Sequence, residues 1–456
     1  MGAICCTPEE LDFGKEVELA HFYLLRVIGK GAFGKVRIVQ HRQTGREYAL
    51  KYISKPRCIE LNATHNIIAE RRLLESIEHP LIVNMRYAFH DEENLFMALD
   101  LMLGGDLRFL LDRYVTLKEM QVRFYIADII CALEYLHRRR IAHRDIKPDN
   151  ILLDEKGHAH LSDFNIATQF YPNKLIRFSR AGSLAYMAPE IVGKQGYSTF
   201  VDWWSLGITA YELLFGNRPF TGTNSDEVVH SILHDKVSFP PDALELISQD
   251  CLDVIKGLLI KSPNQRYGCG PNGISKLKKH PWFNGLDWQA LIEKTAIPPF
   301  KPNTDESNFD AVHELEELLL EEVPLRPHKK LVKTSMDIPQ PETEESRHRQ
   351  WMDEKFLPFD YTKIGIRDHN LSSITTTATT TQLTSSSPAK IEGVSSPMDN
   401  ETTGTGSKGM AGTRLLRRMG SALDQYDQHK YKAKGYVLTP NEDDGPSSIS
   451  ETDKCL

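Results

Sequence analysis

The chain has 456 residues, which is too long for one compact core and indicates two or three structural units. Hydrophobic residues make up 40% of the chain, enough to bury a core, and the net charge of −7 gives no reason to expect nucleic-acid binding. Seven cysteines without Cys-x-x-Cys spacing favour reduced thiols over a zinc site or a disulfide framework, and no apolar run approaches the ~18 residues of a membrane span.

Composition divides the chain into four zones. Residues 1–21 are short and acidic, and residues 22–284 carry dense apolar periodicity, first strand-like and then helical, which predicts two lobes. Residues 285–365 form a tail that contains proline, acidic and aromatic residues. Residues 366–456 are rich in Ser, Thr, Gly and charge, so they cannot bury enough apolar surface to offset their ordering entropy, and we expect them to be mostly disordered.

A glycine-rich stretch lies between two strand-like runs near the start of the second zone. The sequence "IGKGAFGKV" contains Gly29, Gly31 and Gly34, and residues without a Cβ atom let a backbone fold closely over phosphate oxygens. On its own the pattern is weak, because an ordinary hairpin turn has a similar composition. A strand rather than a helix is expected after it, which argues against a dinucleotide-binding fold.

A lysine and a glutamate form the next candidate pair. Lys51 stands in the apolar run "YALK", where a lysine is costly unless it is paired, although most lysines are simply surface residues. Glu70 lies in a segment with helical apolar spacing at Ile67, Leu74 and Ile77, and it is the expected partner. The pair would hold Lys51 against nucleotide phosphates.

The strongest single motif is "HRDIKPDN", which "DFN" follows. Asp145 can accept a hydroxyl proton, and Lys147 can neutralise charge on a transferring phosphoryl group. Asn150 and Asp163 can both ligate magnesium, because an amide and a carboxylate supply the oxygen ligands that this ion prefers. Phosphoryl transfer depends mainly on positioning and charge neutralisation, and these four residues supply both.

In this order, the motifs resemble those of the eukaryotic protein kinases over about residues 22–284. The resemblance implies an α+β, two-lobed kinase fold, with ATP and Mg²⁺ as cofactors and with Lys51, Glu70, Asp145 and Lys147 as catalytic residues. Further matching residues are Ala188, Pro189, Glu190, Asp202, Arg266 and the spine residues Leu74, Met85, His143 and Phe164. The implied nucleotide site comprises Ile28, Gly29, Lys30, Gly31, Ala32, Phe33, Gly34, Lys35, Val36, Ala49, Lys51, Leu99, Asp100, Met102 and Asp106.

The tail is similar to the C-terminal extension of the AGC kinases, which wraps back over the small lobe. In "IPPFKPNTDESNFD", Phe309 matches the tail aromatic that approaches the nucleotide, and in "FLPFDY" Phe356, Phe359 and Tyr361 match the hydrophobic motif. Asp360 stands where many AGC kinases carry a phosphorylated residue, so the motif is expected to dock without modification. "DFN" in place of D-F-G, together with "GGDL" and "HPWF", resembles the YANK branch.

The same resemblance implies residues that select and regulate. Asp106, Asp149 and Glu212 occupy positions where basophilic AGC kinases hold acidic residues that face substrate arginines, although acidic residues are more often simply solvated. Protein substrates are therefore expected to carry Arg or Lys two or three residues before the Ser or Thr. Ser179 matches the activation-loop phosphosite, and Arg144 is its expected phosphate partner. The chain is expected to be a monomer.

Two functions compete: an active serine/threonine kinase in intracellular signalling, and a pseudokinase scaffold that binds partners without phosphoryl transfer. Pseudokinases commonly lose the strand lysine, the catalytic aspartate or the metal aspartate, whereas Lys51, Asp145 and Asp163 are all present. A small-molecule kinase is disfavoured by the "APE" motif and the tail. Asn165 replaces the glycine of D-F-G, and we expect it to be tolerated because asparagine adopts left-handed conformations more readily than most residues.

The N-terminal sequence "MGAICC" resembles a dual acylation signal, with myristate on Gly2 and palmitate on Cys5 and Cys6. One myristoyl chain gives only marginal binding, on the order of 10⁴ M⁻¹, so stable anchoring needs a second signal. The following residues are acidic and provide no polybasic signal, so the cysteines would have to supply it. The expected location is cytoplasmic, anchored at the inner face of the plasma membrane; the alternative is an unmodified N-terminus.

Overall fold

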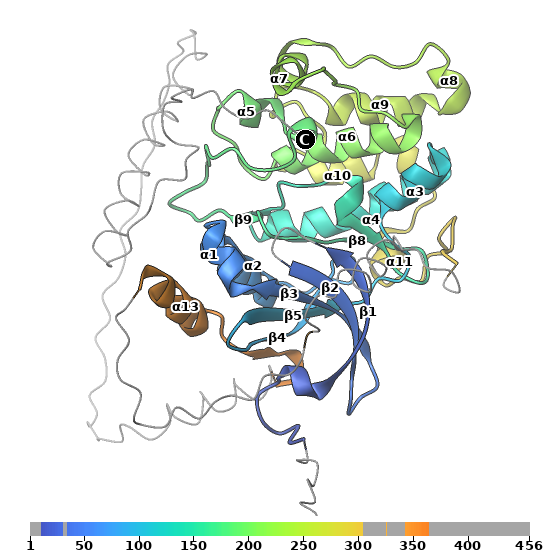
Figure 1. Cartoon of the computed structure of the whole chain (residues 1–456). Coiled ribbons are helices and arrows are strands. Elements are labelled where there is room, and N and C mark those ends of the chain that lie inside the picture. The colour runs from blue at the N-terminus through green and yellow to red at the C-terminus, as the bar shows by residue number, and fades with distance from the viewer. Residues whose placement is uncertain (1–10, 31–33, 304–324, 326–342, 364–456) are drawn as a thin grey trace, which may run out of the picture. The chain divides into compact units, whose positions relative to one another are not determined.

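The computed structural model describes residues 11–30, 34–303, 325 and 343–363 (Figure 1). The predictions for Gly2, Gly31, Ala32, Phe33 and Phe309, and those for residues 366–456, therefore lie outside the described residues. Within them, a β-sheet with two helices forms the small lobe, and a set of helices forms the large lobe. This confirms the predicted α+β, two-lobed class.

The small lobe is built on one antiparallel sheet in the order β1-β2-β3-β5-β4-β10. Its strands are β1 (Phe22–Lys30), β2 (Gly34–His41), β3 (Glu47–Ser54), β4 (Met85–His90), β5 (Asn94–Asp100) and β10 (Phe359–Asp360), and its helices are α1 (Lys55–Glu60) and α2 (Thr64–Ser76). The centre of β5 is fully buried from Leu95 to Ala98. A Cβ atom at Gly34 would lie 1.8 Å from the Tyr52 carbonyl oxygen on β3, so only glycine fits there.

The large lobe is helical around one central helix. Its helices are α3 (Leu107–Tyr114), α4 (Glu119–Arg138), α5 (Pro189–Val192), α6 (Val201–Phe215), α7 (Ser225–His234), α8 (Ala243–Leu246), α9 (Gln249–Leu258), α10 (Gly273–Lys278) and α11 (Trp288–Ile292). Four short strands, β6 (Ile141–Ala142), β7 (Ile151–Leu153), β8 (Ala159–Leu161) and β9 (Thr168–Gln169), form two small ribbons. The helical spacing predicted for α4 is confirmed, because Ile126, Ile129, Ile130, Leu133 and Leu136 are all fully buried.

The tail returns to the small lobe, as Figure 1 shows for α13 (Glu344–Lys355) and β10. Phe356 is fully buried, Phe359 is nearly so, and β10 adds an edge strand to β4. Arg71 of α2 donates a hydrogen bond from Nε to the Leu357 carbonyl oxygen at 2.9 Å, and the fully buried Lys55 of α1 pairs with Asp353 at 2.5 Å. The tail is therefore docked against both helices of the small lobe, through Asp353 on α1 and through Leu357 on α2.

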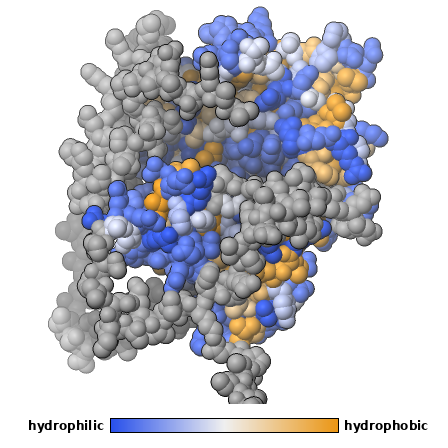
Figure 2. Space-filling view, in the orientation of Figure 1, coloured by the Kyte–Doolittle hydropathy of each residue, from blue (hydrophilic) through white to orange (hydrophobic). Residues whose placement is uncertain are grey.

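Figure 2 shows hydrophilic side chains over much of the visible surface of the described residues, with smaller apolar areas between them. Among these residues, no helix is long and apolar enough to cross a bilayer.

Replacing both Phe356 and Phe359 by Ala should undock the tail and lower the melting temperature. Replacing a fully buried Phe by Ala lowers the free energy of unfolding by about 3–5 kcal/mol. The stability lost at the two positions together exceeds what the remaining polar contacts of α13 can offset. Asp360→Ala should have a milder effect, and the exposed Glu354 on α13 offers a control in Glu354→Ala, which should melt like the parent. Scanning calorimetry of the full chain tests this, and an unchanged melting temperature in the double variant would contradict docking.

Candidate active site

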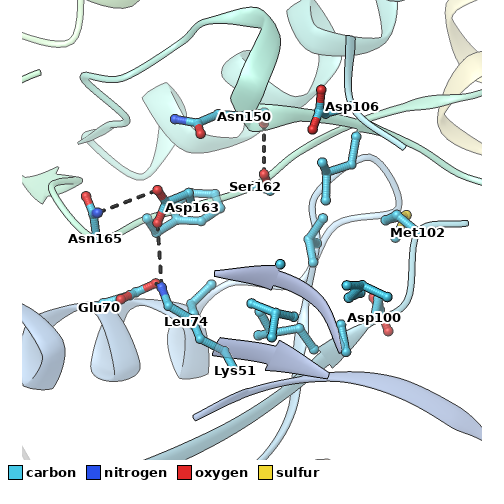
Figure 3. Close-up of a pocket in the computed structure, with 18 of the residues that line it drawn as sticks. Lys51, Glu70, Leu74, Asp100, Met102, Asp106, Asn150, Ser162, Asp163 and Asn165 are labelled. Atoms are coloured by element: carbon cyan, nitrogen blue, oxygen red, sulfur yellow. Dashed lines mark hydrogen bonds and ion pairs between the residues drawn. The ribbon is translucent and has the colours of Figure 1, made fainter. Parts of the chain in front are cut away.

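A cavity of about 430 Å³ lies between the sheet of the small lobe and the first elements of the large lobe (Figure 3). The residues expected to bind nucleotide or metal that line it are Ile28, Gly29, Gly34, Lys35, Val36, Ala49, Lys51, Leu99, Asp100, Met102, Asp106, Asn150 and Asp163. Glu70, Leu74, Asp149 and Asn165 line it as well. Lys30 is the last residue of β1, and its side chain lies outside the described part of the structure. The structure thus gathers residues that are more than 130 positions apart in the chain.

Lys51 is held between two carboxylates at the back of this cavity. Its Nζ lies 2.8 Å from Glu70 Oε1 and 3.6 Å from Asp163 Oδ1. Figure 3 shows the three side chains close together. Burial alone would lower the pKa of Lys51, but the two carboxylates raise it above its ordinary value. Lys51 is therefore a fixed positive charge that points into the cavity, and Glu70 is the partner that the helical spacing predicted.

Asp145 is held as an ionised carboxylate beside the cavity. Lys147 Nζ lies 2.9 Å from its Oδ2, and the Ser183 backbone N–H donates to its Oδ1 at 2.9 Å. Burial would raise the pKa of Asp145, but these hydrogen bonds and the Lys147 charge hold it below its ordinary value. Asp145 can therefore accept a proton near neutral pH. Ser183 is a positioning residue that the sequence motifs did not single out, because the loop that carries it lies far from "HRDIKPDN" in the chain.

Asn150 and Asp163 offer oxygen ligands on the same side of the cavity. Asn150 uses its Nδ2 to donate to the Asp145 main-chain and side-chain oxygens, at 2.8 and 2.9 Å, which leaves its Oδ1 as an acceptor. Among the described residues, no group of three or more His, Cys, Asp or Glu could hold a metal ion by itself. This donor set fits Mg²⁺, which keeps several waters and is bound by few protein oxygens together with phosphates.

Asn165 does not adopt the left-handed backbone for which we expected asparagine to be suited. In this stretch the positive φ of 58° belongs to Asp163, and Asn165 is not among the residues with positive φ. Its side chain instead reaches back, with Nδ2 3.5 Å from Asp163 Oδ2 (Figure 3). In this conformation the position needs no glycine, so the replacement leaves the metal-ligand candidate in place.

Asp202 of α6, whose side chain is fully buried, fixes the loop that carries His143, Arg144 and Asp145. Its carboxylate accepts hydrogen bonds from the backbone N–H groups of His143 and Arg144 at 3.0 and 2.9 Å, and it lies 2.8 Å from His137 Nε2. Burial would raise the pKa of Asp202, but the His137 contact lowers it below its ordinary value. These bonds stabilise the left-handed backbone of Arg144, whose φ is 70°.

The other residues implied by the motifs also meet in space. His143 and Phe164 contact edge to face, with ring centroids 4.9 Å apart, and all four spine residues are buried. Arg266 makes a two-pronged ion pair with Glu190 at 2.7 and 2.8 Å. Ser179 Oγ lies 3.4 Å from Arg144 Nη1, which brings the predicted phosphosite and its predicted partner together.

The three acidic residues expected to face a substrate differ in exposure. Asp149 is exposed, and Asp106 is partly buried because it caps α3 by accepting from the Phe109 N–H at 2.8 Å. Glu212 departs from the expectation: its side chain is only 6% exposed, and Arg108 and Tyr186 of the same chain donate to it. Its carboxylate is buried because an internal cation already lies against it.

Comparisons with known proteins agree with this geometry. The family model described as "Protein kinase domain" matches residues 22–283. Serine/threonine-protein kinase 32B of Homo sapiens is 43% identical over 331 residues, which cover 71% of this chain and 78% of that protein. Serine/threonine-protein kinase 32C of Homo sapiens is 42% identical over 335 residues, covering 72% and 68%. Ribosomal protein S6 kinase alpha-1 of Homo sapiens is 36% identical over 291 residues, covering 63% and 39%.

Asp145→Asn should lower turnover by orders of magnitude while nucleotide binding persists, because the amide cannot accept the proton and Lys51 and Asp163 are untouched. Single-turnover phosphate transfer and fluorescent-nucleotide titration measure the two effects separately. Asn165→Gly is the matched control in the same cavity and should keep turnover within about tenfold, since no proton acceptor or metal-ligand candidate changes. Equal turnover in Asp145→Asn and the parent would refute the assignment.

Proposed function

The chain belongs to the protein kinase family as an ATP-dependent serine/threonine kinase of the AGC group, in its YANK branch, and from this premise we propose how its own residues carry out the transfer and which substrates they select. The observation that carries the proposal is that Lys51 and Asp163 line one cavity 3.6 Å apart, while Asn150, which also lines it, donates a hydrogen bond to Asp145 at 2.9 Å. Lys51 contacts both Glu70 and Asp163, and Asp145 contacts Lys147. No observation favours the pseudokinase scaffold.

In the proposed mechanism, Asp145 orients the substrate hydroxyl and receives its proton as the new oxygen–phosphorus bond forms. The bond from the γ-phosphorus to the bridging oxygen breaks, and the leaving diphosphate keeps that electron pair. Lys147 stabilises the charge on the transferring group, and Lys51 holds the phosphates that remain. Asn150 and Asp163 would hold Mg²⁺, which, when bound, neutralises charge between the phosphates.

We further propose that protein substrates carry a basic residue two or three positions before the acceptor. The support is electrostatic: Asp149 is exposed and Asp106 lines the same edge of the cavity, so both lie where a cationic side chain of a substrate could reach them. The segment "RRMGS", with Arg418 three residues before Ser421, lies outside the described residues and is a candidate autophosphorylation site. The proposed state is a monomer, which light scattering of the purified chain would test.

A peptide array with the purified chain, ATP and Mg²⁺ should show higher phosphorylation of serine peptides that have Arg or Lys at positions −2 or −3 than of peptides with Ala there. The expected advantage is about 2- to 30-fold, the range of one partly exposed charge pair. Asp106→Asn and Asp149→Asn should each reduce it. Preference for acidic residues at both positions would contradict the proposal.

We also propose that the N-terminus carries myristate on Gly2 and palmitate on Cys5 and Cys6, which would hold the kinase at the inner face of the plasma membrane. The support is the sequence alone, because these residues lie outside the described part of the chain.

Membrane fractionation of cells expressing Gly2→Ala should find the protein in the soluble fraction, and Cys5→Ser/Cys6→Ser should release most of it, because a single myristoyl chain binds only marginally. Thr7→Ala is a neighbouring control that should stay with the parent. A Gly2→Ala protein that remains in the membrane fraction would refute acylation at this site.

A further inference from the structure

Arg108 belongs to none of the motifs described above. It lies in the first turn of α3, two residues after Asp106, and its side chain is 31% exposed. From there Nη2 donates to Glu212 Oε1 at 3.0 Å, and Nε lies 3.6 Å from Asp149 Oδ2. One arginine of the chain itself thus contacts two of the three acidic residues expected to meet substrate cations.

The contact between Arg108 and Glu212 is part of a hydrogen-bonded network that also includes Tyr186. Tyr186 of the 3₁₀ turn η3 (Leu184–Tyr186) donates from its hydroxyl to Glu212 Oε2 at 2.5 Å, and Arg108 Nη2 also donates to the Tyr186 oxygen at 2.9 Å. Burial and the Glu212 carboxylate both raise the pKa of Tyr186, so its hydroxyl stays a donor. The two oxygens of Glu212 are each satisfied from within the chain, and the side chain is only 6% exposed.

Arg108 lowers the net negative charge that these acidic residues present to a substrate. Asp106, Asp149 and Glu212 would together present three negative charges to a substrate, and Arg108 reduces the sum to two. An incoming arginine would have to displace Arg108 to reach Glu212, and that exchange replaces one charge-assisted pair by another with no net gain.

We propose that Arg108 is a specificity-determining residue that occupies the Glu212 subsite as an internal stand-in for a substrate arginine, so that this kinase reads one basic residue of a substrate rather than two. The proposal rests on the proposed function, because it refines which basic positions that site selects. Asp106, whose carboxylate caps α3 through the backbone N–H of Phe109, remains to recognise the single cation.

The test compares four serine peptides, with Ala at −2 and −3, Arg at either position, and Arg at both, using kcat/KM of the full chain. For the parent, the second Arg should add less than about fivefold over the better single-Arg peptide, the range of an exposed pair. For Arg108→Ala it should add about tenfold or more, because Glu212 Oε1 then loses its internal cation in a poorly solvated position, while Oε2 keeps the Tyr186 hydroxyl. Arg108→Ala/Glu212→Gln should return to the behaviour of the parent.

Arg113→Ala is the matched control, since it removes the same charge from the exposed side of the same helix and should leave selectivity unchanged. If Arg108→Ala melts early, Arg108→Met keeps the aliphatic stem and should show the same gain. A parent that already gains tenfold from the second Arg, or an Arg108→Ala protein that gains nothing, would overturn the inference while leaving the basic preference intact. If neither Arg raises the kcat/KM of the parent, the proposed basic preference is wrong. The effect of the second Arg on the kcat/KM of Arg108→Ala would still test the inference.

Discussion

The ion pair between Lys51 and Glu70 is the contact on which the rest of the site depends, because it joins the sheet of the small lobe to helix α2 inside the cavity. Glu70 is almost fully buried, and a carboxylate is costly there unless a cation lies against it. Lys51 in turn needs a carboxylate to stay charged in a partly desolvated strand. Each residue therefore fixes the other, and Asp163 completes the set from the large lobe at 3.6 Å.

The position of α2 is set from outside the catalytic domain. Arg71, the neighbour of Glu70 along the helix, is 2% exposed and donates to the main chain of the tail at Leu357. Lys55 at the start of α1 is fully buried and pairs with Asp353 of α13. A buried lysine without its partner would be strongly unfavourable, so the tail is part of the folded small lobe.

Sequence patterns could predict what depends on periodicity or on a compact motif. The apolar spacing of α4, the pairing of Lys51 with Glu70 and the loop around Asp145 all follow from neighbours in the chain or from the family resemblance. Arg108 could not be found this way, because its role comes from contacts with Glu212, which lies 104 positions later. The sequence also does not locate the left-handed residue of "DFN": propensity indicates which residue tolerates a positive φ, whereas the fold places it at Asp163 and not at Asn165.

Hydrogen exchange on the full chain tests most directly the claim that the docked tail holds Glu70 against Lys51. In Phe356→Ala/Phe359→Ala, the amides of α2 from Thr64 to Ser76 should exchange faster than in the parent, while those of α6 in the large lobe, from Val201 to Phe215, should be unchanged. Equal protection of α2 in both proteins would contradict the account, because Glu70 would then be positioned without the tail.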